Sequence, residues 1–373
     1  MGGIDTDRLE RARARLGDAV IDPAVWPEII DQISVAVKAS GGVLLPGDVR
    51  TPDTPRSAGL DELVKTYFEN GWHLRDLRTE RGRPLALKGD KVIMDQDIIT
   101  AQEMRRFAFY NEFLAPQGFK WFAVVSFWVG SELWLLSIQR TMREGPFEAI
   151  DKRTLSQLSR PLADVASLCA AVGRIALSSA TNALNVVGQP AIAIDRFGFV
   201  LDVNYGAEAL FDADVRVTDR RLVVGDAHAK GCLEKMVDQL RVSSDLATLS
   251  CDQIVIRRGA KGPIILQILP VHGCARTPFL GARALLTLTA VEARQGPKTT
   301  LLSRIFGLTP AEARLASIIA EGLSLERAAE ELEVSKATVR NQIRAIFAKT
   351  ATHRQGELIA VLSQLGFVSR LQD

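Results

Sequence analysis

The sequence predicts a multidomain protein in which two α+β domains are followed by an all-α domain of four short helices. The chain has 373 residues, and at about 100–200 residues per domain this length suits two or three domains. β-prone runs separated by glycine-containing turns occur within residues 1–293, together with helical patterns. Residues 301–373 show only helical patterns with capping residues. We expect domains at 1–170, 180–293 and 301–373.

The composition is that of a soluble globular protein. Hydrophobic residues make up 47% and charged residues 24% of the chain, and the formal net charge is +2, so any nucleic-acid signal must be local. The four cysteines form no Cys-x-x-Cys pair, and no histidine lies at metal-ligand spacing from them, which predicts reduced thiols and no metal site. The start is charged, without an apolar signal core, and the longest apolar stretches are too short to cross a membrane. We expect a cytoplasmic protein.

A β-hairpin is the clearest feature of residues 1–170. Trp121–Val129 and Leu133–Ile138 are apolar, β-prone runs, and Gly130-Ser131 between them suits a turn. The earlier segment Leu60–Phe68 has the pattern of a helix. This mixture predicts an α+β domain.

An amphipathic helix follows the hairpin. Its apolar residues recur at alternating steps of three and four: Leu155, Leu158, Leu162, Val165, Cys169 and Val172. This is heptad spacing, and Pro161 is expected to kink the helix. Two interpretations remain open, a helix packed on its own domain and a connector that pairs with a second copy.

Residues 180–293 contain a second α+β pattern. The segment 192–203 reads as strand, Asp-x-x-Gly turn at Asp195–Gly198, and strand. Asn204 can cap a short helix that holds Ala207, Leu210 and Phe211. A helical pattern at His228–Leu240 precedes three further β-prone runs, at 254–256, 264–271 and 284–291. Residues 295–298 suit a linker.

The C-terminal residues contain a series of helix-start signals. Thr309 and Glu312 form a capping box around Pro310, which suits the first helical position, and Gly322 suits the position after the helix. Ser324 and Ser335 can cap two helices that are separated by a turn at Glu333-Val334, and a second capping box at 352–355 is expected to open a fourth helix to Leu365. Two tightly joined helices within a four-helix set predict a helix-turn-helix.

The third of these helices, 335–349, has its charges and apolar residues on different faces. Val339, Ile343, Ile346 and Phe347 lie on one stripe and are expected to face the core. The segment 335–354 carries five cations and no carboxylate, whereas the preceding helix is acidic. A recognition helix needs this arrangement, because Arg and Asn can pair with base edges in the major groove while Lys holds phosphates. The alternative is a solvated basic helix face.

This region resembles the LuxR-type DNA-binding domain over roughly 60 residues, in the motifs Leu308-Thr309-Pro310-Ala311-Glu312, 320–324, 328–332, 334–340 and 346–350. The resemblance implies a four-helix domain whose third helix enters the major groove and whose fourth helix often dimerises. It places Arg340, Asn341 and Arg344 at base-contacting positions. It places other residues near the DNA backbone: Thr338, Gln342 and Lys349, with Lys336 flanking. Ala311, Gln342 and Thr350-Ala351 depart from the family pattern, which puts the DNA sequence in doubt.

Two further resemblances concern the preceding domains. Residues from Ala191 through Phe211 to about Val291 resemble a PAS domain, on their order of strand, Asp-x-x-Gly turn, strand and Asn-capped helix. The first domain resembles a GAF-like domain at Phe109–Leu114, 121–137 and the connector helix. Both resemblances imply sensor domains.

Aromatic residues of the first domain are the candidate ligand-binding residues, since small-molecule pockets are largely apolar. They are Tyr67, Trp72, Trp121, Trp128 and Trp134. A plain hydrophobic core is the alternative interpretation. Arg75 and Asp76 are candidates for orienting a ligand head group or for a surface ion pair. No catalytic motif, phosphate loop or metalloprotease helix occurs, and lone histidines at 228 and 272 do not indicate haem, so no cofactor is expected.

Together these patterns predict a DNA-binding transcription regulator, not an enzyme, whose partners are double-stranded DNA, a second copy of the chain, and a small molecule or protein at the sensor domains. The alternatives are a module that sequesters another regulator without binding DNA, and a sensor enzyme, for which the chain lacks an output segment. The expected dimer contacts are the seam 155–172 and Leu358, Val361, Leu362 and Leu365.

Overall fold

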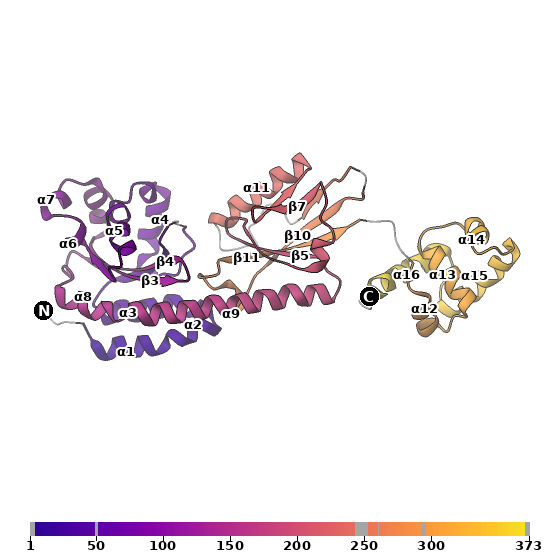
Figure 1. The fold of residues 1–373 in the computed structure, drawn as a ribbon, viewed down its shortest axis with the longest axis horizontal. Helices are drawn as coiled ribbons and strands as arrows, with labels where there is room; N and C mark the ends of the chain where they lie inside the picture. The colour runs from indigo at the N-terminus through magenta and orange to yellow at the C-terminus, as the bar shows by residue number, and fades with distance from the viewer. Residues whose placement is uncertain (1–3, 49–50, 243–252, 260, 292–295, 370–373) are drawn as a thin grey trace.

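The computed structural model describes residues 4–48, 51–242, 253–259, 261–291 and 296–369. It is a mixed α/β protein in which Figure 1 shows three folded bodies in a row. We call them the first unit (4–170), the middle unit (180–291) and the C-terminal unit (296–369). Residues 1–3, 292–295 and 370–373, which belong to the expected domain ends and linker, lie outside the described residues, as does Cys251.

The first unit is built on a four-stranded antiparallel sheet of order β1-β4-β3-β2. The expected hairpin is confirmed, because β3 and β4 pair from Val129/Glu132 outward. The expected helix at 60–68 corresponds to α4. The elements are α1 (Thr6–Ala14), α2 (Asp18–Ile21), α3 (Trp26–Ala36), β1 (Gly41–Pro46), α4 (Asp61–Glu69), α5 (Leu77–Leu87), β2 (Val92–Met94), α6 (Asp95–Ile98), α7 (Ala101–Met104), β3 (Phe119–Val129), β4 (Glu132–Thr141) and α8 (Ala149–Ser156). Short turns of 3-10 helix are η1 (Arg15–Gly17), η2 (Pro23–Val25), η3 (Ala58–Leu60), η4 (Trp72–Leu74) and η6 (Ala115–Gln117), and η5 (Phe109–Leu114) is a π-helix.

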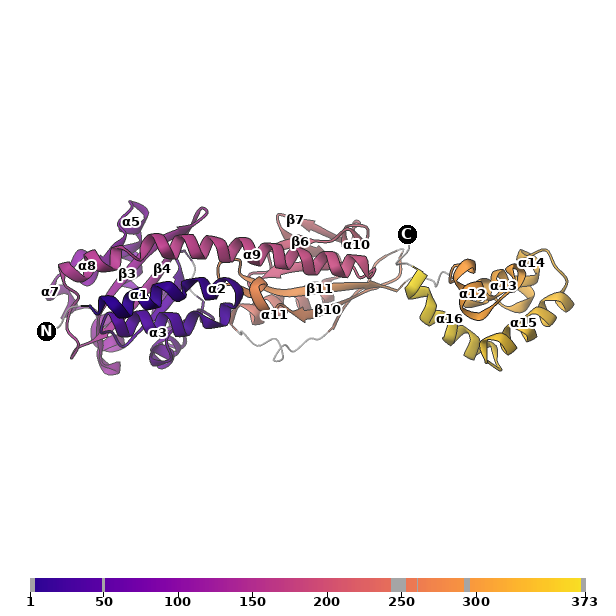
Figure 2. The same ribbon diagram turned by 90° about the horizontal axis from the view of Figure 1, so that it is seen from below.

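Both faces of this sheet are covered, which explains why β3 is apolar at almost every position. Ala123, Val125 and Phe127 pack in a core with α1, α3 and the long helix α9 (Ser159–Val186). Phe122 and Val124 point to the other face, into a core with α4, α5 and η5. Figure 2 shows α1, α3 and α9 lying side by side along the first of these faces.

The predicted connector helix is divided into α8 and α9 between Ser156 and Ser159. Pro161 therefore does not kink a helix but lies in the first turn of α9, where its missing N–H leaves no hydrogen bond unmade. The seam residues Leu155, Leu158 and Leu162 are buried in the core of the first unit. This supports packing of the seam within its own unit.

By length and composition, the helical run Ala149–Val186 could cross a membrane, with a mean hydropathy of 1.4 over its most apolar window. The run lies outside the expectation from continuous apolar stretches, because charged residues interrupt it. Figure 1 shows α9 extending along both the first and the middle unit, and its side chains pack in the cores of both. Packing on two sheets favours a core helix of a globular protein.

The middle unit has a five-stranded antiparallel sheet of order β6-β5-β11-β10-β9 and a separate hairpin, β7-β8. The elements are β5 (Ala191–Asp195), β6 (Val200–Val203), α10 (Tyr205–Glu208), β7 (Val215–Thr218), β8 (Arg221–Val224), α11 (Ala227–Val242), β9 (Gln253–Ile256), β10 (Ile264–Pro270), η8 (Gly273–Arg276) and β11 (Ala282–Ala290). The expected turn is confirmed, since the Asp195 carboxylate accepts the backbone N–H groups of Phe197 and Phe199. Asn204 caps α10 through the N–H of Ala207, but α10 ends before Leu210 and Phe211. The β7-β8 hairpin was not predicted.

The loop between β10 and β11 joins the middle unit to the first. Phe279 from this loop makes edge-on contacts with Trp26 and Trp134, at ring-centroid distances of 5.4 and 4.7 Å. All three side chains are buried in one core. Burying three aromatic side chains across the junction couples the two units.

The C-terminal unit contains one helix more than predicted. Its helices are α12 (Thr299–Phe306), α13 (Pro310–Ala320), α14 (Leu325–Glu331), α15 (Lys336–Thr350) and α16 (Gln355–Ser369). Thr309 and Glu312 form the expected capping box, but the expected box at 352–355 is wrong. The Thr352 hydroxyl instead contacts that of Thr350, and the Gln355 amide donates to the carbonyl of Leu323. Leu358 and Leu362 are buried within the unit rather than available for a dimer.

Candidate functional site

The short turn between α14 and α15 sets the orientation of α15 relative to α14. Ser324 accepts the N–H of Arg327 and so begins α14, and Ser335 accepts the N–H of Thr338 and so begins α15. Between them Glu333 has φ of +52°, in the left-handed region, so the chain reverses within a few residues. Two helices joined by such a short turn have a fixed crossing geometry.

One side of α15 is anchored in the unit, as predicted. Val339, Ile343 and Ile346 are buried, and Phe347 packs against the same core. The candidate DNA-binding side chains on the opposite side are exposed; they are Lys336, Thr338, Arg340, Asn341 and Arg344. The helix therefore presents a basic, acid-free face on a rigid support.

Two predicted DNA-binding residues are less free to contact DNA than the others, because one is paired and the other is half-buried. The Lys349 ammonium donates to the Glu312 carboxylate at 2.7 Å, which ties the end of α15 to the start of α13. Gln342 is half-buried, and its side-chain carbonyl oxygen is buried without a hydrogen-bond partner among the described residues. A phosphate at Lys349 would have to compete with Glu312.

The pKa of Glu312 is held below its usual value, first by the Lys349 ammonium and then by the N–H and hydroxyl of Thr309. The ionised carboxylate thus links the start of α13 to the end of α15.

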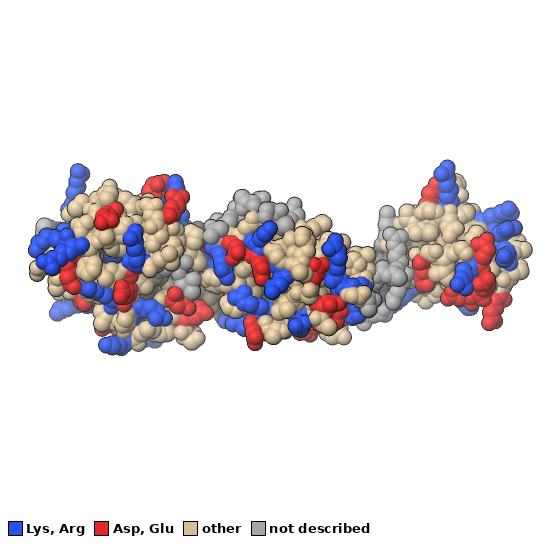
Figure 3. Space-filling model, turned by 90° about the horizontal axis from the view of Figure 1, so that it is seen from above, with Lys and Arg blue, Asp and Glu red and all other residues tan. Residues whose placement is uncertain are grey.

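Outside this site, Figure 3 shows Lys and Arg mixed with Asp and Glu along the face in view, in keeping with the small net charge. The basic signal is local to α15.

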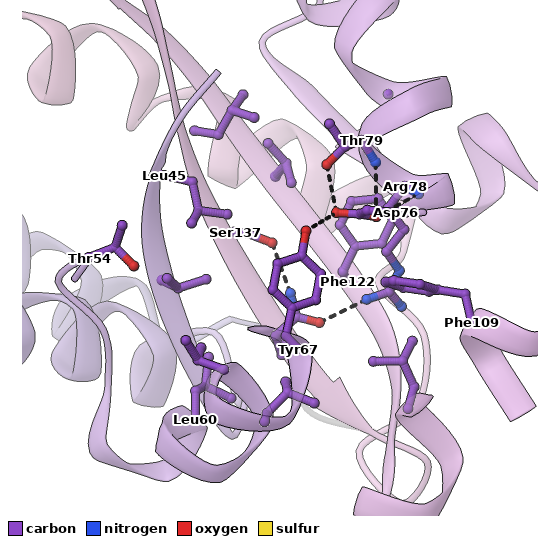
Figure 4. A pocket seen from close by; sticks show the side chains of 18 of the residues that line it. Leu45, Thr54, Leu60, Tyr67, Asp76, Arg78, Thr79, Phe109, Phe122 and Ser137 are labelled. Carbon is purple, nitrogen blue, oxygen red and sulfur yellow. Dashed lines mark hydrogen bonds between the residues drawn. The ribbon is translucent and has the colours of Figure 1, made fainter. Parts of the chain in front are cut away.

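A second candidate site is a pocket of about 100 Å³ in the first unit. It lies between the sheet and the helices α4 and α5, and Figure 4 shows it with its lining side chains. The lining is mostly apolar, with Leu45, Leu60, Phe109, Phe122 and Leu135 among the residues. A cavity of this size suits a ligand about as large as a single ring.

One wall of this pocket is polar and ordered by Asp76. This carboxylate caps α5 by accepting the N–H groups of Arg78 and Thr79, and it also accepts the hydroxyls of Tyr67 at 2.7 Å and Thr79 at 2.6 Å. All of its strong acceptor positions are occupied. Asp76 therefore positions the Tyr67 ring rather than pairing with Arg75, whose guanidinium lies over Trp72.

A buried ion pair between Arg78 and Asp95 supports the polar side of the pocket. The Arg78 guanidinium donates to Asp95 at 3.2 Å and to Gln139 at 2.9 Å, and lies 4.3 Å from the Phe122 ring centre. Asp95 also accepts the Tyr110 hydroxyl at 2.5 Å. Burial raises the pKa of the Tyr110 phenol, so Tyr110 stays a donor to Asp95. Such a saturated network gives a rigid, preorganised wall.

The predicted ligand-binding aromatics do not share this pocket. Tyr67 lines it. Trp72 stacks on Phe113 in the adjoining core, and Trp121 is half-buried under Lys120. Trp128 is exposed and Trp134 packs on the opposite face of the sheet. Alternation along β3 and β4 separates these tryptophans.

Sequence reasoning missed Arg78, Asp95 and Thr54. Arg78 and Asp95 are both buried charges, the first in a polar segment and the second directly after the apolar strand β2, and no sequence pattern marks them as a pair. Thr54 lines the pocket with a buried hydroxyl that has no partner among the described residues. The segment Phe109–Leu114, on which the GAF-like resemblance partly rests, forms the π-helix η5 and contains Tyr110, which donates to Asp95. π-helical turns often occur at functional sites.

Among the described residues, no group of three or more His, Cys, Asp or Glu side chains is arranged to hold a metal ion.

No family model matches the chain, and no curated protein matches it. One solved structure, titled "Crystal structure of the phage VqmA-DPO complex", is similar at 17% identity over 51% of this chain and 89% of that chain, with a TM-score of 0.19. At that score the similarity carries no argument about fold or function.

Proposed function

We propose that this protein is a LuxR-type transcription regulator that binds duplex DNA through α15. The observation that supports it is the exposed face of Lys336, Arg340, Asn341 and Arg344, opposite a helix face buried in the unit's core. A helix held in this way can enter the major groove, where Arg can pair with guanine and Asn with adenine. The Lys336 ammonium would contact phosphate.

We propose that the first and middle units are sensor domains, GAF-like and PAS-like respectively. Each has an antiparallel sheet with helices on its faces. The first unit contains the pocket, whose apolar lining and polar wall suit a small, mostly apolar molecule with one hydrogen-bonding group facing Thr54. A ligand there alters DNA binding only if it binds the DNA-competent and incompetent states differently.

We also propose that the regulator acts as a homodimer, because two recognition helices read two half-sites of an inverted repeat. The seam residues from Leu155 to Cys169 pack within the first unit, whereas Val172 does not belong to that core. The opposite face of α9 is exposed and carries Leu168, Ile175 and Val186. Together with Val172, Ser179 and Asn182 between them, these residues recur at steps of four and three, which is heptad spacing. A second copy of α9 suits this face.

The test of DNA binding uses the full chain and the DNA fragments that it selects from its own genome. Arg340→Ala and Arg344→Ala are each expected to weaken binding of the selected site by about 1–3 kcal/mol and to relax base preference. Fluorescence anisotropy against the selected site and a shuffled site measures both effects. Arg314→Ala, at an exposed position of α13, is the matched control.

If the chain selected no DNA, or if the α15 variants bound as tightly as the unaltered chain, DNA recognition by α15 would be excluded. A regulator that sequesters another protein would then be the better account.

A further inference from the structure

Two polar side chains lie on the face of β4 that is turned toward the pocket of the first unit. Side chains alternate along a strand, so this face carries the following residues in turn: Leu133, Leu135, Ser137 and Gln139. Ser137 and Gln139 are each 7% exposed, and both line the pocket. A cavity that was only a gap in a hydrophobic core would be expected to have apolar side chains at these buried positions.

Arg78 sets the orientation of the Gln139 amide. A guanidinium group can only donate hydrogen bonds, so the Gln139 atom that faces Arg78, at 2.9 Å, is the carbonyl oxygen. The amide nitrogen of Gln139 then donates to the Ser137 hydroxyl oxygen at 2.8 Å. Figure 4 shows both bonds as dashed lines. The Arg78 charge polarises this chain of bonds, which strengthens the Ser137 hydroxyl as a donor.

The hydrogen of the Ser137 hydroxyl is left for a molecule in the pocket. Its oxygen accepts from Gln139, and among the described residues no group accepts its hydrogen. The hydroxyl of Thr54, also in the lining, has no partner among the same residues. A buried donor without a partner is costly. The ligand group that suits Ser137 is therefore a hydrogen-bond acceptor.

The charged groups at the pocket balance one another. Arg78 and Arg83 line it as cations, and Asp76 lines it as a carboxylate. Asp95, which is paired with Arg78, supplies a second carboxylate. A charged ligand would add an uncompensated charge to a mostly apolar cavity, which is costly. The pocket therefore favours an uncharged molecule.

We propose that the pocket of the first unit binds an uncharged ring compound that carries a carbonyl group, and that Ser137 donates to the carbonyl oxygen. This inference rests on the proposed sensor function of the first unit and names the class of its ligand. A carbonyl oxygen is an uncharged acceptor, and a single ring matches the volume of about 100 Å³. A buried donor discriminates against analogues that lack the acceptor, because it is then left unpaired.

The test measures the binding of three ring compounds of similar size to the full chain by titration calorimetry. Acetophenone has the carbonyl group, α-methylstyrene has a C=CH₂ group in its place, and benzoate has a charged carboxylate. We expect acetophenone to bind about 10-fold more tightly than either of the others, because it alone gives Ser137 an acceptor without adding charge.

Ser137→Ala is the informative variant. It is expected to weaken acetophenone binding about 10-fold and to leave α-methylstyrene binding unchanged or tighter. The preference between the two compounds should thus disappear, and a change in stability does not alter this ratio within one protein. Ser126→Ala removes a buried hydroxyl of β3 that donates to the Asp90 carbonyl, outside the pocket lining, and should keep the full preference.

Three results overturn the proposal: no acetophenone binding to the unaltered chain, equal binding of acetophenone and α-methylstyrene, or an unchanged preference in Ser137→Ala. If Ser137→Ala does not fold, the comparison in the unaltered chain decides. Equal binding would still leave a small-molecule pocket, so the proposed sensor function would stand without this ligand class. DNA binding by α15 is measured separately, so its failure is distinguishable from a failure at Ser137.

Discussion

Single residues decide how much room the pocket of the first unit has. Gly82 on α5 lines this pocket, and a Cβ added there would meet only the Ile93 side chain, at 3.7 Å. Gly82 is also a glycine in a helix, where an alanine is more favourable by about 1 kcal/mol. A side chain at this position therefore enters the cavity without disturbing the backbone.

Gly82→Leu is expected to fill the pocket and to abolish the response of the target promoter to its inducing condition, while DNA binding by the free protein is unchanged. Gly82→Ala, which adds one methyl group, is expected to keep most of the response and to raise thermal stability slightly. Reporter assays and anisotropy measure the two properties. A Gly82→Leu protein that folds, binds DNA and still responds normally would show that the signal enters elsewhere.

A second residue of note is Ala351, which ends α15 with φ of +52°. This left-handed conformation favours glycine, and glycine is the residue that the LuxR-type pattern commonly has here. The alanine at this position therefore places a local backbone strain at the end of α15. It leaves the helix itself intact.

At the scale of helices, the contact between Glu312 and Lys349 links the start of α13 to the end of α15. Because its folded-state pKa is lowered, Glu312 contributes stability that is present above its unfolded value of about 4.3. That contribution is lost as the pH falls through the lower folded value. The contact that holds the end of α15 should thus weaken in acid.

Glu312→Gln is expected to lower the unfolding temperature at pH 7 and to have a progressively smaller effect as the pH falls below about 4.3, where the unaltered carboxylate is protonated as well. Scanning calorimetry of both proteins across this range measures the difference. Glu331→Gln, at an exposed position of α14, is the control. A difference that stays constant down to pH 2 would contradict the ionised contact.

At the scale of the whole molecule, α9 joins the first and middle units along its buried face and leaves an apolar face exposed. Ile175, at 67% exposure, lies at the middle of that face. If two copies pair there, Ile175→Arg is expected to produce a monomer, since two buried arginines would face each other. Binding to an inverted-repeat site should weaken with it.

Sedimentation of the free and DNA-bound chain measures this change. Leu74→Arg is the control. Leu74 is a large apolar residue on the first unit that is at least as exposed as Ile175, and its substitution should leave the dimer unchanged. A dimer that persists in Ile175→Arg would place the contact elsewhere, and a strictly monomeric unaltered chain would refute dimerisation.

Local features of the chain were predictable because their causes lie within a few residues. The capping box of Thr309 and Glu312, the serine caps of α14 and α15, and the Asp195 turn each form through hydrogen bonds between near neighbours. The β3-β4 hairpin follows from two apolar runs and a short turn. The apolar stripe of α15 is likewise a local pattern, and it determines which side of the helix is basic, so the candidate DNA interface was readable from the sequence.

The pocket of the first unit and the contact between the first and middle units depended on tertiary structure, because the residues that form them are far apart in the chain. Arg78 contacts Gln139 and Arg283 contacts Asp53, and no periodicity relates such residues. The same holds for α9: its heptad pattern establishes an apolar stripe, but only packing decided that this stripe faces its own unit. The sequence alone was enough to predict α13, α14, α15, the Asp195 turn and the basic face of α15, because the hydrogen bonds that form them are local. Burial between distant segments decided where the connector helix is divided and which charges and aromatic side chains meet.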